Sequence, residues 1–195
     1  MQTHFLFDVL EGYQPFEQIA EESRRDGAVI AASGLAGAQK AHLACALAAK
    51  TGRPLVFLCD SERSAAQTME DVSALMGGGV SLFPAREITF YQDVAASRDV
   101  AYRRIEAMRK LVSGEVRAIV APADAMLHRV MPRAVFSANT ISLRVGDVLP
   151  TDQLIERLLA AGYTREYMVE GKGQFSVRGG IVDIYPADAL SAVRI

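Results

Sequence analysis

The chain has 195 residues, half of them hydrophobic, and a formal net charge of −2 at pH 7. This length and apolar content allow a real core in one large domain or two small ones. The small net charge argues against a dedicated duplex-binding protein, which usually carries a basic stripe, so we expect little direct DNA binding. No stretch approaches the ~18 apolar residues of a membrane span, and the N-terminus has no secretory pattern, which predicts a cytoplasmic protein without membrane contact.

The sequence offers no local signature of a metal centre or a catalytic nucleophile. Cys45 and Cys59 lie in apolar runs and are interpreted as reduced, buried thiols. The three histidines are far apart, and no Cys or His pair has the spacing of metal ligands. We therefore expect no catalytic residue, no metal and no cofactor in this chain.

The first two thirds of the chain predict a parallel sheet with helices on its faces. A short helix is expected over 16–25, after Pro15. Short apolar runs then alternate with longer helical patterns. The predicted strands, all read as covered on both faces, are 28–32, 55–59, 80–83 and 118–121. The predicted helices, each closed by a glycine, are 38–50, 62–76 and 98–112.

The helix predicted over 98–112 has an apolar stripe and several basic residues. Its basic residues, which we interpret as a solvated face rather than a DNA contact, are Arg103, Arg104, Arg109 and Lys110.

The pattern changes in the last third, and we place a domain boundary near residue 128, giving domains 1–128 and 129–195. A strand is expected over 135–144 and a helix over 151–160. A small antiparallel sheet should follow, with a turn at Gly179-Gly180. The last residues, 192–195, look like a strand in progress. We therefore expect a fragment of a longer protein with an incomplete second domain.

The loop after the first predicted strand stands where a phosphate-binding loop would lie. It contains Gly34, Gly37 and Lys40, but Gln39 replaces the glycine expected before the lysine and Ala41 replaces the hydroxyl that would ligate Mg²⁺. Lys40 and the helix N-terminus could still contact an anion. The missing groups nevertheless predict no ATP hydrolysis.

The tracts 161–170 and 171–186 combine a fixed spacing of arginine, glycine, aspartate and proline. They resemble a segment shared by the excision-repair protein UvrB and the N-terminal part of the transcription-repair coupling factors. Residues 52–67 are similar to both families, whereas 82–87 and 98–104 are more similar to the coupling factors. The resemblance implies a UvrB- or helicase-like α/β domain with a degenerate nucleotide loop, followed by a small β-rich domain. Any antiparallel sheet with glycine turns remains the plain alternative.

The resemblance also implies a function. In the coupling factors this module is non-catalytic and docks UvrA of nucleotide excision repair, which brings UvrA to a stalled RNA polymerase. The ATP-driven translocase and the polymerase-binding domain lie elsewhere in such proteins. Those other domains are further candidate partners of this module, and the sequence does not decide whether they hold it in an autoinhibited state.

The family's UvrA-contacting arginines correspond to Arg165 and Arg178. Strand alternation adds Gln174 and Ser176 to the face of Arg178, and Ser176 stands where UvrB has a further arginine. The alternative for Arg165 and Arg178 is a pair of solvated strand arginines.

Only ten residues separate Glu87 from Arg98, where UvrB carries a long β-hairpin that probes damaged DNA. We therefore expect no damage verification, and we interpret Phe90 and Tyr91 as packing residues. Two alternative functions remain: a nucleotide-dependent UvrB-type helicase or phosphotransferase fragment, and an unrelated α/β domain.

Overall fold

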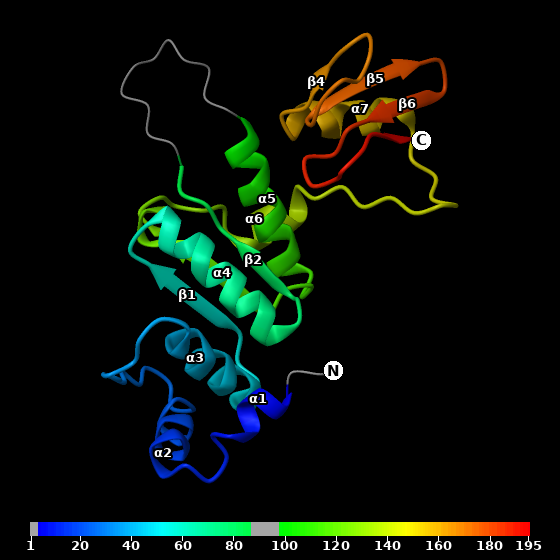
Figure 1. Ribbon diagram of the computed structural model, residues 1–195. Coiled ribbons are helices and arrows are strands. Elements are labelled where there is room, and N and C mark those ends of the chain that lie inside the picture. The colour runs from blue at the N-terminus through cyan, green and yellow to red at the C-terminus, as the bar shows by residue number, and fades with distance from the viewer. Residues whose placement is uncertain (1–3, 87–97) are drawn as a thin grey trace. The chain divides into compact units, whose positions relative to one another are not determined.

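The computed structural model describes residues 4–86 and 98–195, which form two compact units (Figure 1). The first unit comprises residues 1–94 and 107–128, and the second comprises 95–106 and 129–195. Helix α5 (Arg98–Val112) is continuous and contributes to both units.

The first unit contains a three-stranded parallel sheet with the strand order β1-β3-β2. Its strands are β1 (Leu55–Cys59), β2 (Val80–Leu82) and β3 (Ala118–Pro122), and the 3₁₀ turn η1 (Ala123–Met126) follows β3. Its helices, besides the end of α5, are α1 (His4–Asp8), α2 (Gln14–Glu22), α3 (Ala38–Thr51) and α4 (Glu62–Met76).

The bounds of helix α4 are set by the residues at its two ends. Ser61 and Ser64 form a reciprocal capping box at its start, and Gly77 adopts φ 68° at its end, a conformation that glycine takes at no steric cost. The predicted bounds of α4, and also those of α5, are confirmed to the residue.

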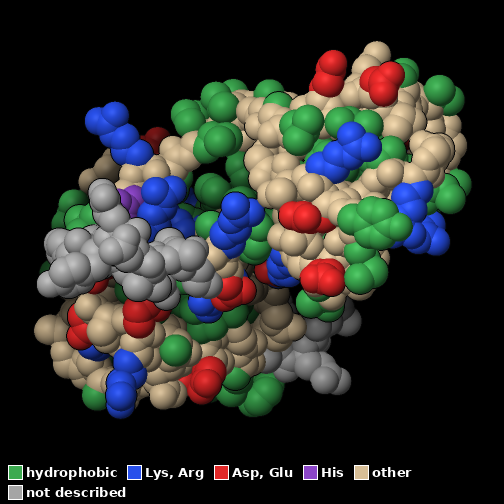
Figure 2. Space-filling model, turned by 90° about the horizontal axis from the view of Figure 1, so that it is seen from above, with side chains coloured by type: hydrophobic (Ala, Val, Ile, Leu, Met, Phe, Trp, Pro, Cys, Tyr) green, Lys and Arg blue, Asp and Glu red, His purple; other side chains and the backbone are tan. Residues whose placement is uncertain are grey.

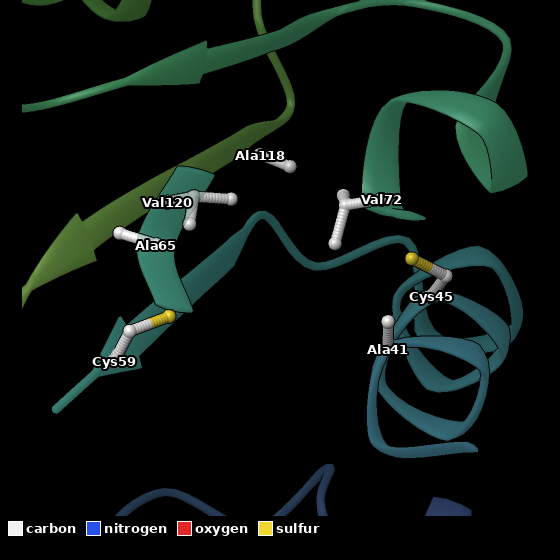
Figure 3. Close-up of a cluster of buried hydrophobic side chains, with 7 residues drawn as sticks. All are labelled: Ala41, Cys45, Cys59, Ala65, Val72, Ala118 and Val120. Atoms are coloured by element: carbon white, nitrogen blue, oxygen red, sulfur yellow. The ribbon is translucent and has the colours of Figure 1, made fainter. Parts of the chain in front are cut away.

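The central strand β3 separates two apolar clusters. Ala118 and Val120 pack with side chains of α3 and α4, among them Ala41, Cys45 and Val72 (Figure 3). Ile119 and Ala121 pack in the other cluster with Ala107 of α5. Since alternate residues of a strand point to opposite faces, helices cover β3 on both sides, as its apolar run predicts.

The strand predicted over 28–32 is wrong, because these residues form no regular secondary structure and are exposed. A strand needs a neighbour that pairs with its backbone, and three of these five residues are alanines, which have little strand preference. The prediction that β1 is covered on both faces is also wrong. Val56 and Leu58 of this edge strand are 58% and 54% exposed.

The second unit holds a four-stranded sheet with the order β4-β5-β6-β7. Its elements, besides the start of α5, are α6 (Arg133–Ala138), α7 (Thr151–Ala160), β4 (Thr164–Arg165), β5 (Gln174–Arg178), β6 (Ile181–Ile184) and β7 (Val193–Arg194). The predicted β5–β6 hairpin and the final strand are confirmed. The sheet is mixed rather than antiparallel, because β4 runs parallel to β5.

The strand predicted over 135–144 is also wrong, since these residues form the end of α6 followed by irregular chain. Its apolar residues do not alternate regularly, so the pattern does not separate a strand from a short helix. Helix α7 packs Leu154 and Leu158 against Phe175, Val182 and Ile184, which form the core of this unit.

One of the predictions about the basic residues of α5 is wrong. Arg104 is buried, which contradicts the prediction of a solvated residue. It lies one turn before the buried Ala107, on the same helix face. Residues 87–97, which form the short link and include Phe90 and Tyr91, lie outside the described residues. On the face shown in Figure 2, basic side chains are scattered among acidic and hydrophobic ones.

Both cysteines are buried and unbridged, and burial raises the pKa of the Cys45 thiol to about 11. Within residues 4–86 and 98–195 no group of acidic, His and Cys side chains could hold a metal ion. Among the described helices, none combines the length and the hydropathy that crossing a bilayer requires.

Candidate protein-interaction site

A shallow depression lies on the second unit, where the end of β4 meets β5. It is lined by Arg165, Glu166, Tyr167, Ser176, Val177 and Arg178. Both arginines singled out from the sequence are therefore on its wall, although 13 positions separate them in the chain. The parallel pairing of β4 with β5 brings them together, because Arg165 is in register with Phe175.

Strand β5 has one face toward the core and one face away from it. Phe175 is buried in the core and Val177 is packed against it. Ser176 and Arg178 alternate with these residues and so belong to the opposite face. Arg178 is exposed, whereas Ser176 is only 2% exposed because the chain that follows β4 lies over it.

Tyr167 connects the two arginine-bearing strands. Its carbonyl oxygen accepts a 3.0 Å hydrogen bond from Ser176 Oγ and a 3.1 Å hydrogen bond from Arg178 Nη2. The Arg178 guanidinium also lies 5.3 Å from the centroid of the Tyr167 ring, within the range of a cation–π contact. The sequence shows no sign of this arrangement, because Tyr167 lies in the irregular segment that follows β4.

Gln174 braces the neighbouring loop. Its Oε1 accepts hydrogen bonds of 2.9 Å from the backbone N–H groups of both Glu170 and Gly171. These bonds occupy the acceptor oxygen of this candidate residue. In contrast, the side chain of Arg165 is exposed and forms no hydrogen bond or ion pair with the described part of the chain, although its backbone belongs to β4.

An arginine–aspartate ion pair lies on the same sheet face and was not identified from the sequence. Arg194 of β7 donates two hydrogen bonds to Asp183 of β6, at 2.6 and 2.9 Å. These bonds and the positive charge of Arg194 hold the pKa of the Asp183 carboxyl below its usual value. The two residues are in register across the strands, a relation that only the β6–β7 pairing reveals.

The predicted phosphate loop lies in the first unit. Gly34 and Gly37 both have positive φ, and Gly37 precedes α3. Gln39 folds its side chain back, so that its Oε1 accepts a 3.0 Å hydrogen bond from the N–H of Ala36. Lys40 is exposed, while Ala41 is buried among the side chains of the core.

Comparisons with known proteins agree with this architecture. Residues 141–195 match the UvrB interaction domain. The chain is 32% identical over 164 residues to the transcription-repair-coupling factor of Bacillus subtilis, which covers 84% of this chain and 14% of that protein. Identity to the factor of Myxococcus xanthus is 32% over 182 residues, covering 89% of this chain and 15% of the relative. UvrABC system protein B of Chlorobium limicola is 26% identical over 201 residues, covering 95% of this chain and 29% of the relative. The chain thus spans only about a seventh of the two coupling factors.

Proposed function

Because this chain belongs to the transcription-repair-coupling factor family and carries a UvrB interaction domain, we propose that it is a non-catalytic module that captures UvrA. The surface that binds UvrA is the depression lined by Arg165 and Arg178. The observation that carries the proposal is the convergence of these two arginines on one depression. Arg178 is already held by the Tyr167 carbonyl and ring, so it loses little side-chain entropy when a partner binds.

The proposed biological role is the recruitment of UvrA, and with it nucleotide excision repair, to a stalled RNA polymerase. Contact with the polymerase and ATP-driven movement along DNA belong to other parts of a longer parent protein. Such a role places the module in the cytoplasm with the transcription machinery. Residues 129–195 act as the UvrA-binding domain in this proposal, and residues 1–128 act as its UvrB-like companion.

The four candidate residues have different parts in the proposal. Arg165 and Arg178 supply charge to acidic groups of UvrA. Ser176 is too buried to meet a partner and holds Tyr167, while Gln174 holds the chain at Glu170 and Gly171. These two polar residues therefore shape the surface rather than contribute direct contacts.

We also propose that the loop from Gly34 to Ala41 is a degenerate phosphate loop that does not bind nucleotide. The support is that Gln39 places its own oxygen on a loop amide, that of Ala36. An intact loop would keep such amides for phosphate oxygens. The buried Ala41 offers no hydroxyl to Mg²⁺.

The test is the binding of purified UvrA to the 195-residue chain, measured by surface plasmon resonance. The variants are Arg165→Glu and Arg178→Glu, and the control is Arg157→Glu, which reverses an exposed charge on α7. Reversing a charge that is desolvated at an interface typically costs ~2–5 kcal/mol, so each test variant should lose most of the binding. The control should bind normally, and all three should melt near the wild-type temperature. Normal binding by both test variants would contradict the proposed surface.

A further inference from the structure

Tyr167 is the most exposed aromatic side chain beside the depression. Its side chain is 89% exposed, and the next residue, Met168, is 58% exposed. Single exposed apolar residues are common on protein surfaces and need no explanation by themselves. Tyr167 differs from such residues because specific contacts hold it in place while its ring stays exposed.

The backbone of Tyr167 is held by two side chains of β5. Ser176 Oγ and Arg178 Nη2 both donate to its carbonyl oxygen, at 3.0 and 3.1 Å. Ser176 is a buried polar residue whose hydroxyl is satisfied by this bond. An exposed residue with a fixed backbone loses less conformational freedom when a partner binds.

The ring of Tyr167 in turn positions Arg178. The guanidinium lies 5.3 Å from the ring centroid and uses one of its nitrogens for the carbonyl bond. A guanidinium carries five N–H donors, so further donors remain for a ligand. The planar group is thus partly ordered before any partner arrives, and the exposed ring offers an apolar surface directly beside it.

We propose that Tyr167 and Arg178 act as one recognition unit that binds a carboxylate lying next to an apolar side chain on the protein partner. Arg178 takes the carboxylate, and the Tyr167 ring packs against the apolar neighbour. Tyrosine and arginine are among the residue types enriched at the energetic centre of protein interfaces, and Tyr167 is then a contact residue in its own right. This inference rests on the proposed function and adds the chemistry of the surface that UvrA presents.

A single carboxylate fits this unit better than the phosphates of a nucleic acid. Glu166 lines the same depression, and the chain as a whole has a net charge of −2. A polyphosphate backbone would meet this negative charge along its length, whereas one carboxylate needs only the guanidinium. The exposed ring also favours a partner with an apolar side chain beside its charge.

The test measures UvrA binding for Tyr167→Ala and for Tyr167→Phe, which keeps the ring. Tyr167→Ala should weaken binding at least about tenfold, as expected for a central aromatic contact, and Tyr167→Phe should stay close to wild type. Neither change should alter the melting temperature, because the side chain is exposed. Equal loss in both variants, or normal binding by Tyr167→Ala, would overturn the role of the ring.

A double-mutant cycle tests whether the two residues act together. Tyr167→Ala should weaken binding less in an Arg178→Ala background than in the wild-type chain, since the ring positions the guanidinium. If the losses of affinity in the two single variants simply multiply in the double variant, the two residues act independently and the recognition unit is overturned.

A second experiment measures the binding of a labelled single-stranded oligonucleotide to the wild-type chain and to both single variants. Binding that depends on both residues would assign the unit to phosphate and overturn the carboxylate.

The outcomes separate this inference from the function on which it rests. If the wild-type chain does not bind UvrA, the proposed function fails and the recognition unit fails with it. If Arg165→Glu and Arg178→Glu lose binding while Tyr167→Ala keeps it, the proposed function stands and this inference alone is overturned.

Discussion

The hydroxyl of Tyr102 donates a 2.8 Å hydrogen bond to the carbonyl oxygen of Lys172, 70 residues further along the chain. The next residue, Gly173, has φ +77°, and a Cβ added there would overlap the Tyr102 Oη atom. Gly173 also donates to the carbonyl of Tyr185 and accepts from the N–H of Thr164. Glycine is therefore required here both by the backbone conformation and by the neighbouring tyrosine.

Gly173→Ala should destabilise the second unit by more than the ~1–3 kcal/mol of a left-handed non-glycine residue, because the new methyl group also meets Tyr102. Gly179→Ala is the matched control, since Gly179 has φ +63° with open space around it. Urea unfolding of both variants measures the difference. Adding Tyr102→Ala to Gly173→Ala should recover the part caused by overlap. Equal destabilisation by the two glycine variants would contradict the steric explanation.

The Asp183–Arg194 pair predicts a dependence of stability on acid pH. Because Arg194 lowers the pKa of Asp183 in the folded chain, the unfolded chain binds a proton at this site more readily. The stabilisation is present above the ordinary pKa of 3.8 and is lost as the pH falls through the lower folded value. Arg194→Ala should therefore raise the Asp183 pKa, as measured by NMR titration of its carboxyl carbon. Arg157→Ala should leave the titration unchanged, and an unshifted Asp183 in Arg194→Ala would exclude the pair as the cause.

The loop of the first unit should not bind Mg-ATP. Calorimetry at millimolar nucleotide should give no saturable heat, because Gln39 occupies the Ala36 amide and Ala41 lacks a metal-ligating hydroxyl. Gln39→Gly frees that amide but should not create magnesium-dependent binding, since the hydroxyl is still missing. Saturable binding to the wild-type chain that disappears in Lys40→Ala would sink the interpretation of a degenerate loop.

Elements with local start and stop signals could be predicted from the sequence. Gly77 ends α4, and α7 spans the predicted residues 151–160, directly after Pro150. The β5–β6 hairpin follows from the alternation along 174–178, the turn at Gly179-Gly180 and the apolar run that resumes at Ile181. These signals act within a few residues, so no knowledge of the distant chain is needed.

Features that depend on distant partners could not be predicted. Residues 28–32 form a continuous apolar run, yet no strand pairs with them in the described structure. The burial of Arg104 depends on what packs against α5. Tyr167 lies in an irregular segment and contacts two residues of β5, Ser176 and Arg178, which are 9 and 11 positions further along the chain. No sequence pattern predicts that this segment folds back onto β5.

The two faces of β5 also limit how this region can change its length over evolution. Substitutions can be absorbed one position at a time, but a single residue inserted within β5 would shift every later side chain to the other face of the sheet. Val177 would then turn away from the core and Arg178 would turn into it. Related chains should therefore keep the spacing from Phe175 to Ile184 constant.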